Sequence, residues 1–248
     1  MDSAQAVGPM RAVLVAGASG LVGRELLRLC LADPDVQTVK ALLRRDVSLD
    51  ALLGAAQPND APLTDAQRRK FQPCIVEFDR LERHAELFAV DAVFCALGTT
   101  IRQAGSQAAF RQVDFDAPLQ IAQLARAQGA SRFLLVSALG ASARSRVFYN
   151  RVKGELEDAI QAIGFAQFVV ARPSLLQGNR PEFRFGERLG LWLSRVLAGL
   201  IPESHRPVHV RQVAQGLLHA ARDAVHTLDA GKAPPRRVLP NAWLRRMR

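Results

Sequence analysis

Two apolar patterns follow one another near the start of the chain. Ala12 to Ala16 is a continuous apolar run, which is typical of a strand buried on both faces of a parallel sheet. From Leu21 to Leu31 the apolar residues recur at helical spacing and lie roughly on one face of a helix. Three glycines stand at the junction of the two patterns, at Gly17, Gly20 and Gly23. The stretch from Met10 to Cys30 therefore predicts a strand, a glycine-rich turn and a helix.

The alternation of strand and helix patterns continues along the chain. Further strands are expected at Val36–Leu43, Cys74–Phe78, Asp91–Leu97, Ser131–Ser137, Phe165–Ala171 and, as a short one, Val238–Leu239. Further helices are expected at Leu81–Phe88, Phe110–Gln128, Val147–Ile163, Gly186–Leu200 and Val210–Ala221. Residues 46–72 carry the Gly, Pro, Asn and Asp of a crossover and predict no firm helix. This order indicates an α/β fold with a doubly wound parallel sheet and helices on both faces.

The length of 248 residues suits one large domain over residues 1–248, with a small helical region at its C-terminal end. We expect residues 175–205 to cover the substrate and residues 231–248 to form a basic tail. The helical pattern at Gly186–Pro202 fits packing in the core, and it also fits a substrate cover, the seam of a homodimer or a contact with a membrane surface. Arg188 and Arg195 interrupt this stretch, so no transmembrane segment is expected.

The charge balance is basic, with 33 Lys and Arg against 23 Asp and Glu and a net charge of +10. Such a charge favours anionic partners. The excess is almost all arginine spread along the chain, and one cluster occurs at the C-terminal end, at Arg236, Arg237, Arg245, Arg246 and Arg248. No aromatic-rich or recognition-helix pattern accompanies the cluster, so a solvated tail is expected there and no nucleic-acid partner.

The cysteines indicate a reducing environment. Cys30, Cys74 and Cys95 lie in apolar segments, and their odd number and spacing do not suggest disulfides or a metal site. The N-terminal residues also lack a basic region followed by an apolar one, which a secretory signal requires. Together these features predict a cytoplasmic location and no bound metal.

The glycine-rich turn is placed where a nucleotide would bind. A helix N-terminus offers unpaired backbone N–H groups and a favourable dipole to a pyrophosphate, and glycine lets the backbone approach closely. The spacing is GxxGxxG rather than the more common GxGxxG. A left-handed turn combined with tight helix packing would also select glycine. The position after the first strand and before the first helix favours the cofactor interpretation.

Residues at the ends of later strands indicate which dinucleotide is bound. Arg44 and Arg45 follow the second expected strand, Arg44 lies 21 residues after Gly23, and the nearest acidic residue, Asp46, comes after both arginines. Arginine at this place accommodates the 2′-phosphate of NADP, whereas an acidic residue binds the ribose of NAD. NADP(H) is therefore the expected cofactor, although arginines also occur at strand ends for solvation alone. Asp79 is expected near the adenine, and Gly98 where the second half of the dinucleotide would pass.

A second group of residues suggests catalysis. Tyr149, the only tyrosine of the chain, and Lys153 are four residues apart on one expected helix, so they share a face. Ser137 stands at the carboxyl end of the fifth expected strand, where open α/β sheets keep their sites. An ammonium group beside a phenol stabilises the phenolate and lowers the pKa of the phenol, so the tyrosine can act as an acid/base near neutral pH. A serine hydroxyl can orient a substrate carbonyl. Each of the three residues also has an ordinary explanation. Tyr149 and Lys153 could be a pair on the protein surface, and Ser137 could be a polar residue at the end of a strand.

Taken together, these segments resemble the short-chain dehydrogenases/reductases of the atypical kind, from Val13 through about Ala221. The segments that carry the resemblance are GASGLVG, LLRRD, VFCALGTT, RQVDFD, FLLVSALGA, FYNRVKGELE and ARPSLL. The Tat-interacting oxidoreductase-like subgroup is the most similar. The resemblance implies a Rossmann-like NAD(P)-binding fold and an oxidoreductase that acts on a small-molecule substrate.

The resemblance also implies roles for particular residues. The phosphate loop would comprise Ser19, Gly20, Leu21 and Val22, with Arg44 and Arg45 on the 2′-phosphate. Leu97 and Gly98 would line the cofactor, Tyr149 and Lys153 would bind its ribose and flank the nicotinamide, and Leu176 and Arg184 would close over it. Ser137 fits the catalytic serine of the superfamily. One position departs from the superfamily, because Asp114 occupies the place of an asparagine that often completes a proton relay.

Two functions of different classes follow. The first is an NADP-dependent oxidoreductase acting on a carbonyl or alcohol, with Tyr149 as the acid/base. The second is an NADPH-binding regulatory or interaction protein with little turnover, to which the Asp114 departure lends weight. A nucleotide-sugar epimerase or dehydratase is less suitable, since only about 70 residues follow the sixth expected strand and such enzymes carry a larger substrate lobe.

Overall fold

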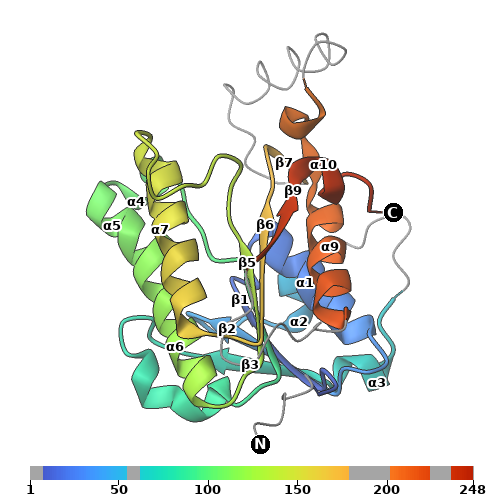
Figure 1. The fold of residues 1–248 in the computed structure, drawn as a ribbon. Coiled ribbons are helices and arrows are strands. Elements are labelled where there is room, and N and C mark those ends of the chain that lie inside the picture. Colours follow the sequence, from blue (N-terminus) through green and yellow to red (C-terminus); the bar gives the residue numbers. More distant parts are fainter. Residues whose placement is uncertain (1–7, 55–61, 179–201, 224–235, 248) are drawn as a thin grey trace, which may run out of the picture.

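The computed structural model describes residues 8–54, 62–178, 202–223 and 236–247, and these form an α/β fold built on one parallel sheet (Figure 1). The order of strands in that sheet is β3-β2-β1-β4-β5-β6-β9, and all neighbours are parallel. The strands are β1 Ala12–Ala16, β2 Thr38–Leu43, β3 Phe71–Ile75, β4 Ala92–Cys95, β5 Arg132–Val136, β6 Gln167–Arg172 and β9 Arg237–Pro240. A separate parallel pair joins β7 Leu176–Gln177 to β8 Val208–His209. The expected doubly wound sheet is confirmed.

Helices cover both faces of the sheet. One layer contains α1 Leu21–Ala32, α2 Leu49–Leu53 and α9 Val210–Arg222, and the other contains α6 Ala117–Ala127 and α7 Phe148–Ile163. Short helical segments complete the fold: α3 Asp65–Arg68, η1 Leu81–Phe88, α4 Ile101–Ala104, α5 Gln107–Arg111, η2 Gln112–Asp116, η3 Glu203–His205 and α10 Asn241–Leu244. Successive β1 residues explain the two layers, because Val13 packs toward α1 and Leu14 toward α6, and both are fully buried.

The strand order creates the position for a ligand. The chain winds outward from β1 through β2 to β3 and then returns to the other side of β1 with β4. The connections that leave the carboxyl ends of β1 and β4 therefore diverge, and in doubly wound sheets ligands bind in the resulting crevice. Gly17 follows β1 and Leu97 follows β4 at this edge.

The third strand differs from expectation. It spans Phe71–Ile75 rather than Cys74–Phe78, and Asp79 lies in an exposed turn beyond it. Among the described strands, β3 pairs only with β2, so it is an edge strand that needs no continuous apolar run; Ile75 is accordingly 51% exposed and Pro73 is tolerated. The apolar run that suggested a strand instead continues into a loop. The crossover of residues 46–72, where the sequence predicts no firm helix, contains two short helices, α2 and α3.

The long helix expected at Phe110–Gln128 is interrupted. The π-helical turn η2 separates α5 from α6. Asp114 lies four residues after Phe110 and seven before Ile121, so the three share one helix face and all are fully buried, whereas Val113 is 37% exposed. The buried position of Asp114 brings a carboxylate to the site described below.

Within residues 236–247, the chain packs against the fold instead of forming the solvated tail that its arginines suggest. Residues 236–247 form β9 and α10, which include the expected short strand, and Leu244 is fully buried. Arg236 pairs with Asp158 at 2.5 Å, and Arg237 pairs with Asp223 at 2.5 Å. The side chains are held because the last strand carries them to acidic partners on α7 and after α9. The expected helix at Gly186–Leu200, Arg184, and most of the segment 175–205 lie outside the described residues.

The remaining general expectations concern membranes and thiols. In the ranges that the structure describes, no helix combines the length and the apolar character that a membrane span needs. Cys30, Cys74 and Cys95 are free and buried, as expected. Burial raises the pKa of the Cys95 thiol to about 11, so it stays protonated near neutral pH.

Candidate cofactor and catalytic site

The glycine-rich turn connects β1 to α1 with little space to spare. Gly17 has φ +85°, and a Cβ atom there would lie 2.6 Å from the carbonyl oxygen of Ala96. A Cβ atom at Gly23 would lie 2.0 Å from the carbonyl oxygen of Gly17. The close packing of the turn therefore requires glycine at both positions even if no ligand binds. This agrees with the alternative interpretation of the glycines, in which tight helix packing selects them. Gly20 is less crowded, because the nearest atom to a Cβ there is 3.2 Å away.

The same turn leaves the N-terminus of α1 suited to an anion. Gly20 is the N-cap residue, and no side chain caps the helix. Its own N–H donates to the carbonyl of Gly17 at 2.9 Å, while Ser19 is exposed and Leu21 is partly exposed. An N-terminus without a side-chain cap has backbone N–H groups that a phosphate can accept from. The residues at this turn therefore fit the pyrophosphate of a dinucleotide.

The segment after β6 reaches this helix end. A Cβ atom at Gly178 would lie 3.1 Å from Val210 Cγ2 and 3.5 Å from Leu21 Cδ2. Leu176, two residues earlier, is partly buried against the core on the α1 and α9 side. The β7–β8 pair thus lies beside the first turn of α1, where Leu176 is expected to contact the cofactor.

The two arginines expected at the 2′-phosphate follow β2 directly. Arg44 and Arg45 are exposed, and within the described residues neither guanidinium takes part in a hydrogen bond or ion pair. The neighbour of β2 on one side is β1, so both arginines lie at the same edge as the glycine turn. They are placed to receive an anionic group there.

A buried ion pair forms the centre of the site. Lys153 Nζ lies 2.8 Å from Asp114 Oδ1, and the two side chains are 3% and 0% exposed. Burial by itself lowers the pKa of Lys153, but the charge of Asp114, with contributions from Tyr149 and Cys95, raises it above its ordinary value. Lys153 is therefore an ammonium group at neutral pH even though water hardly reaches it.

This ion pair adjoins the carboxyl end of β4. Asp114 Oδ2 accepts a hydrogen bond from the N–H of Thr99 at 2.8 Å. A Cβ atom at Gly98 would lie 3.4 Å from Asp114 Oδ1 and 3.7 Å from Lys153 Nζ. The absence of a side chain at Gly98 thus leaves space in front of the lysine, as the close passage of a dinucleotide requires.

Tyr149 stands at the first turn of α7, one turn before Lys153. It is partly buried, and its ring centroid lies 5.6 Å from that of Phe110 in a tilted contact. Phe110 is fully buried and fixes this side of the ring. Tyr149 lies near enough to Lys153 to contribute to the raised pKa of the lysine. The structure therefore brings together Tyr149, Lys153, Asp114 and Gly98.

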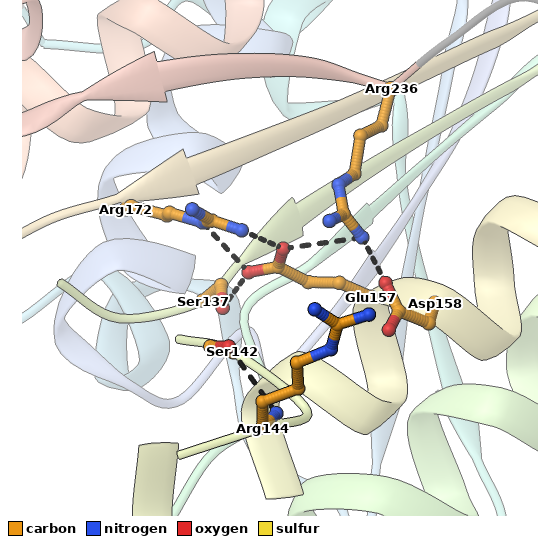
Figure 2. A network of polar contacts seen from close by, with 7 residues as sticks. All are labelled: Ser137, Ser142, Arg144, Glu157, Asp158, Arg172 and Arg236. Carbon is orange, nitrogen blue, oxygen red and sulfur yellow. Dashed lines mark hydrogen bonds and ion pairs between the residues drawn. The ribbon is translucent and has the colours of Figure 1, made fainter. Parts of the chain in front are cut away.

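Ser137 belongs to a different polar network, which Figure 2 shows. Its hydroxyl donates to Glu157 Oε1 at 2.6 Å. The carboxylate of Glu157 is fully buried and also accepts from Arg172, with Nε 3.1 Å from Oε1 and Nη2 2.5 Å from Oε2. Arg236 approaches the same carboxylate at 3.7 Å. A hydroxyl has a single proton, so Ser137 cannot donate a second hydrogen bond while it donates to Glu157.

Sequence reasoning missed the importance of Glu157 and Thr99. A signal for Glu157 exists, because Tyr149, Lys153 and Glu157 are spaced four residues apart and share one face of α7. Thr99 acts through its backbone, which no side-chain motif reveals. Asp114 was noted only as a departure from the superfamily pattern, and its pairing with Lys153 joins two helical segments that sequence spacing does not relate.

Comparison with known proteins agrees with this arrangement. A family model described as NAD(P)H-binding matches residues 17–182. The chain belongs to this NAD(P)H-binding family. Two relatives of this NAD(P)H-binding protein are Protein HTATIP2 of Rattus norvegicus, 34% identical over 195 residues, and Protein fmp52, mitochondrial, of Emericella nidulans, 32% identical over 200 residues. The matches cover 78% of this chain and 73% of HTATIP2, and 79% of this chain and 78% of fmp52. The expected likeness to the Tat-interacting subgroup is confirmed.

Solved structures with the same fold have low sequence identity. The UDP-N-acetylglucosamine 4-epimerase from Methanobrevibacter ruminantium M1 superposes with a TM-score of 0.61 at 13% identity, covering 87% of this chain and 74% of the epimerase. A 3-oxoacyl-[acyl-carrier protein] reductase from Brucella melitensis gives 0.60 at 14% identity, covering 86% and 89%. These likenesses establish the Rossmann-like fold and say nothing of the substrate.

The prediction of a cytoplasmic location is wrong, because the names of several relatives contradict it. Relatives from Emericella nidulans, Scheffersomyces stipitis, Candida albicans and Debaryomyces hansenii are all named as mitochondrial proteins. The cysteine pattern indicates only that the thiols are reduced, and reduced thiols do not distinguish one reducing compartment from another.

Proposed function

We propose that this NAD(P)H-binding protein is an NADP(H)-dependent oxidoreductase that transfers a hydride to or from a small-molecule carbonyl or alcohol. The observation that carries the proposal is the charged Lys153, which is 3% exposed, pairs with Asp114 at 2.8 Å, and lies beside Gly98 and one helical turn after Tyr149. Burying an ammonium group costs free energy that apolar residues in the same place would not cost. A buried charge at the ligand-binding edge of a doubly wound sheet therefore favours a functional role for Lys153.

The side chains of the site have separate tasks. Tyr149 is the acid/base that exchanges a proton with the substrate oxygen, and Lys153 supports its anionic form and donates hydrogen bonds to the cofactor ribose. Bound NADP(H) supplies or accepts the hydride. The N-terminus of α1 binds the pyrophosphate, and Leu97, Gly98 and Leu176 line the cofactor. Asp79, in its exposed turn after β3, is the residue proposed near the adenine.

The preference for NADP(H) over NAD(H) rests on Arg44 and Arg45. Both are exposed at the carboxyl end of β2, and no acidic residue stands between that strand and the arginines. Two guanidinium groups favour the 2′-phosphate of NADP(H) through charge-assisted hydrogen bonds.

A second candidate function is supported by the Ser137 network. The hydroxyl of Ser137 donates to Glu157 and is not free to donate to a substrate carbonyl. Asp114 also balances the charge of Lys153, which reduces the field that would help Tyr149 to release a proton. Both features favour an NADPH-binding regulatory or interaction protein that turns over little substrate.

Substitution of Tyr149 by Phe distinguishes the two functions. We expect Tyr149→Phe to lower NADPH-dependent reduction of a panel of aldehydes and ketones by about 100-fold or more, because it removes the transferable proton. The dissociation constant for NADPH, measured by calorimetry, should change less than about threefold, since the ring and Lys153 remain. A wild-type protein that binds NADPH but reduces none of the panel would contradict the oxidoreductase and favour the regulatory function.

A further inference from the structure

The residue that occupies the place of the superfamily asparagine has a specific geometry. Asp114 is fully buried in the π-turn η2 and contacts two other elements. Oδ1 faces Lys153 of α7 at 2.8 Å, and Oδ2 accepts the N–H of Thr99, after β4, at 2.8 Å. A single carboxylate thus joins the helix that carries the proposed catalytic residues to the loop that lines the proposed cofactor site.

We propose that Asp114 is a positioning residue, a buried counter-ion that keeps Lys153 permanently protonated and aimed at the cofactor beside Gly98. The proposal rests on the proposed cofactor site. It assigns Asp114 an electrostatic task that asparagine in the same place cannot perform, because an amide carries no charge. Lys153 then acts mainly as a fixed donor for the cofactor, and its charge is balanced within the protein.

The surroundings of Lys153 support this assignment. In the part of the chain that the structure describes, the other ionisable groups near the ammonium are Tyr149 on its own helix and Cys95 on β4. Burial keeps the Cys95 thiol protonated near neutral pH. In the resting protein, Asp114 is therefore the anion that balances the ammonium, and without it the burial of Lys153 would favour the neutral amine.

The pH dependence of the free energy of unfolding should show, without any ligand, whether Asp114 balances the charge of Lys153. With Asp114 present, the pKa of folded Lys153 is raised, so the pair stabilises the fold below the ordinary lysine pKa and this contribution is lost only as the pH rises through the folded pKa. In Asp114→Asn, burial would instead lower the folded pKa. The unfolded chain then binds more protons than the folded one, and stability rises with pH up to the ordinary lysine pKa.

The test is urea unfolding of the full chain between about pH 8 and pH 10, where the two signs differ. We expect wild type to show no gain in stability across this range and Asp114→Asn to become steadily more stable. The double variant Asp114→Asn/Lys153→Met should lose that rise, because no lysine remains to titrate. Asp158→Asn is the matched control on α7, since its carboxylate is 56% exposed and pairs with Arg236. A rise of the same slope in Asp158→Asn, or none in Asp114→Asn, overturns the proposal.

A second measurement connects the counter-ion to the cofactor. NADPH affinity of Asp114→Asn should fall by about threefold to tenfold over the same pH range as Lys153 loses its proton, while wild type lacks this step. A merely structural role would lower affinity equally at every pH, and that result contradicts the proposal. If wild type binds no NADPH at all, the proposed function fails, and the unfolding series still decides the role of Asp114.

Discussion

Single residues of the glycine turn answer two different requirements. Gly17 needs its positive φ and its close approach to Ala96, and Gly23 allows α1 to pack on the turn. Neither requirement depends on a ligand. Gly20 and the uncapped end of α1 are the features that fit a phosphate. The glycine spacing alone therefore indicates a tight strand-turn-helix unit, and the open helix end adds the indication of a nucleotide.

Substitution of Gly23 tests the packing requirement. A Cβ atom there would lie 2.0 Å from the carbonyl oxygen of Gly17, so we expect Gly23→Ala to lower the free energy of unfolding by about 3 kcal/mol or more. Gly129→Ala is the control, because Gly129 has φ +90° but no atom within 4 Å of its Cβ position. Its loss should be about 1–2 kcal/mol. Equal losses in chemical denaturation would show that the turn has room to adjust.

The residues of the site were predicted to different degrees. The spacing of Tyr149 and Lys153 places them on one helix face whatever the tertiary structure, so that pair could be read directly from the sequence. Asp114 shares a buried helix face with Phe110 and Ile121, but its partner Lys153 lies on another helix, and sequence spacing does not show that contact. Ser137 was correctly placed next to the end of β5, but its partner Glu157 comes from a helix twenty residues later, and sequence spacing does not show such contacts.

Among the elements, β9 was expected as a short strand, whereas the packing of the C-terminal segment against the fold was not. The arginines of this segment suggested a solvated tail, yet β9 pairs with β6 and α10 is anchored by Asn241, which is 1% exposed. Asn241 accepts the N–H of Ser174 at 2.9 Å and donates to the carbonyl of Arg206 at 2.8 Å. The C-terminal helix thereby holds the segment after β6 and the segment before β8 together. Composition alone cannot reveal this anchoring, because it depends on one side chain.

Substitution of Asn241 tests that anchoring. We expect Asn241→Ala to lower the free energy of unfolding by about 2–3 kcal/mol, because backbone groups of Ser174 and Arg206 lose their bonds to the amide. Arg246→Ala is the matched control on the same terminal segment, since Arg246 is 71% exposed and pairs with Glu203 at 3.8 Å. Its effect should stay below about 0.5 kcal/mol. A loss in Asn241→Ala as small as the control would mean that the terminal helix is not anchored there.

For the whole molecule, the doubly wound parallel sheet was the most predictable property. Continuous apolar strands alternating with amphipathic helices allow few arrangements other than a doubly wound parallel sheet, because crossover connections are right-handed and both faces must be covered. Strand boundaries were less certain at the β3 edge, where burial is incomplete. The substrate could not be predicted, since a shared fold does not determine the chemistry of the ligand.

The measurement that tests the central claim most directly is calorimetric titration of the purified protein with NADPH and with NADH. Arg44→Ala/Arg45→Ala is measured beside Arg83→Ala/Arg126→Ala, which removes the same charge from two exposed arginines elsewhere. We expect NADPH to bind at least about tenfold more tightly than NADH, and only the first double variant to lose that preference. Equal affinity for the two cofactors would contradict the NADP(H) assignment. If neither bound at millimolar concentration, the cofactor site itself would be refuted and the glycine turn would be explained by packing alone.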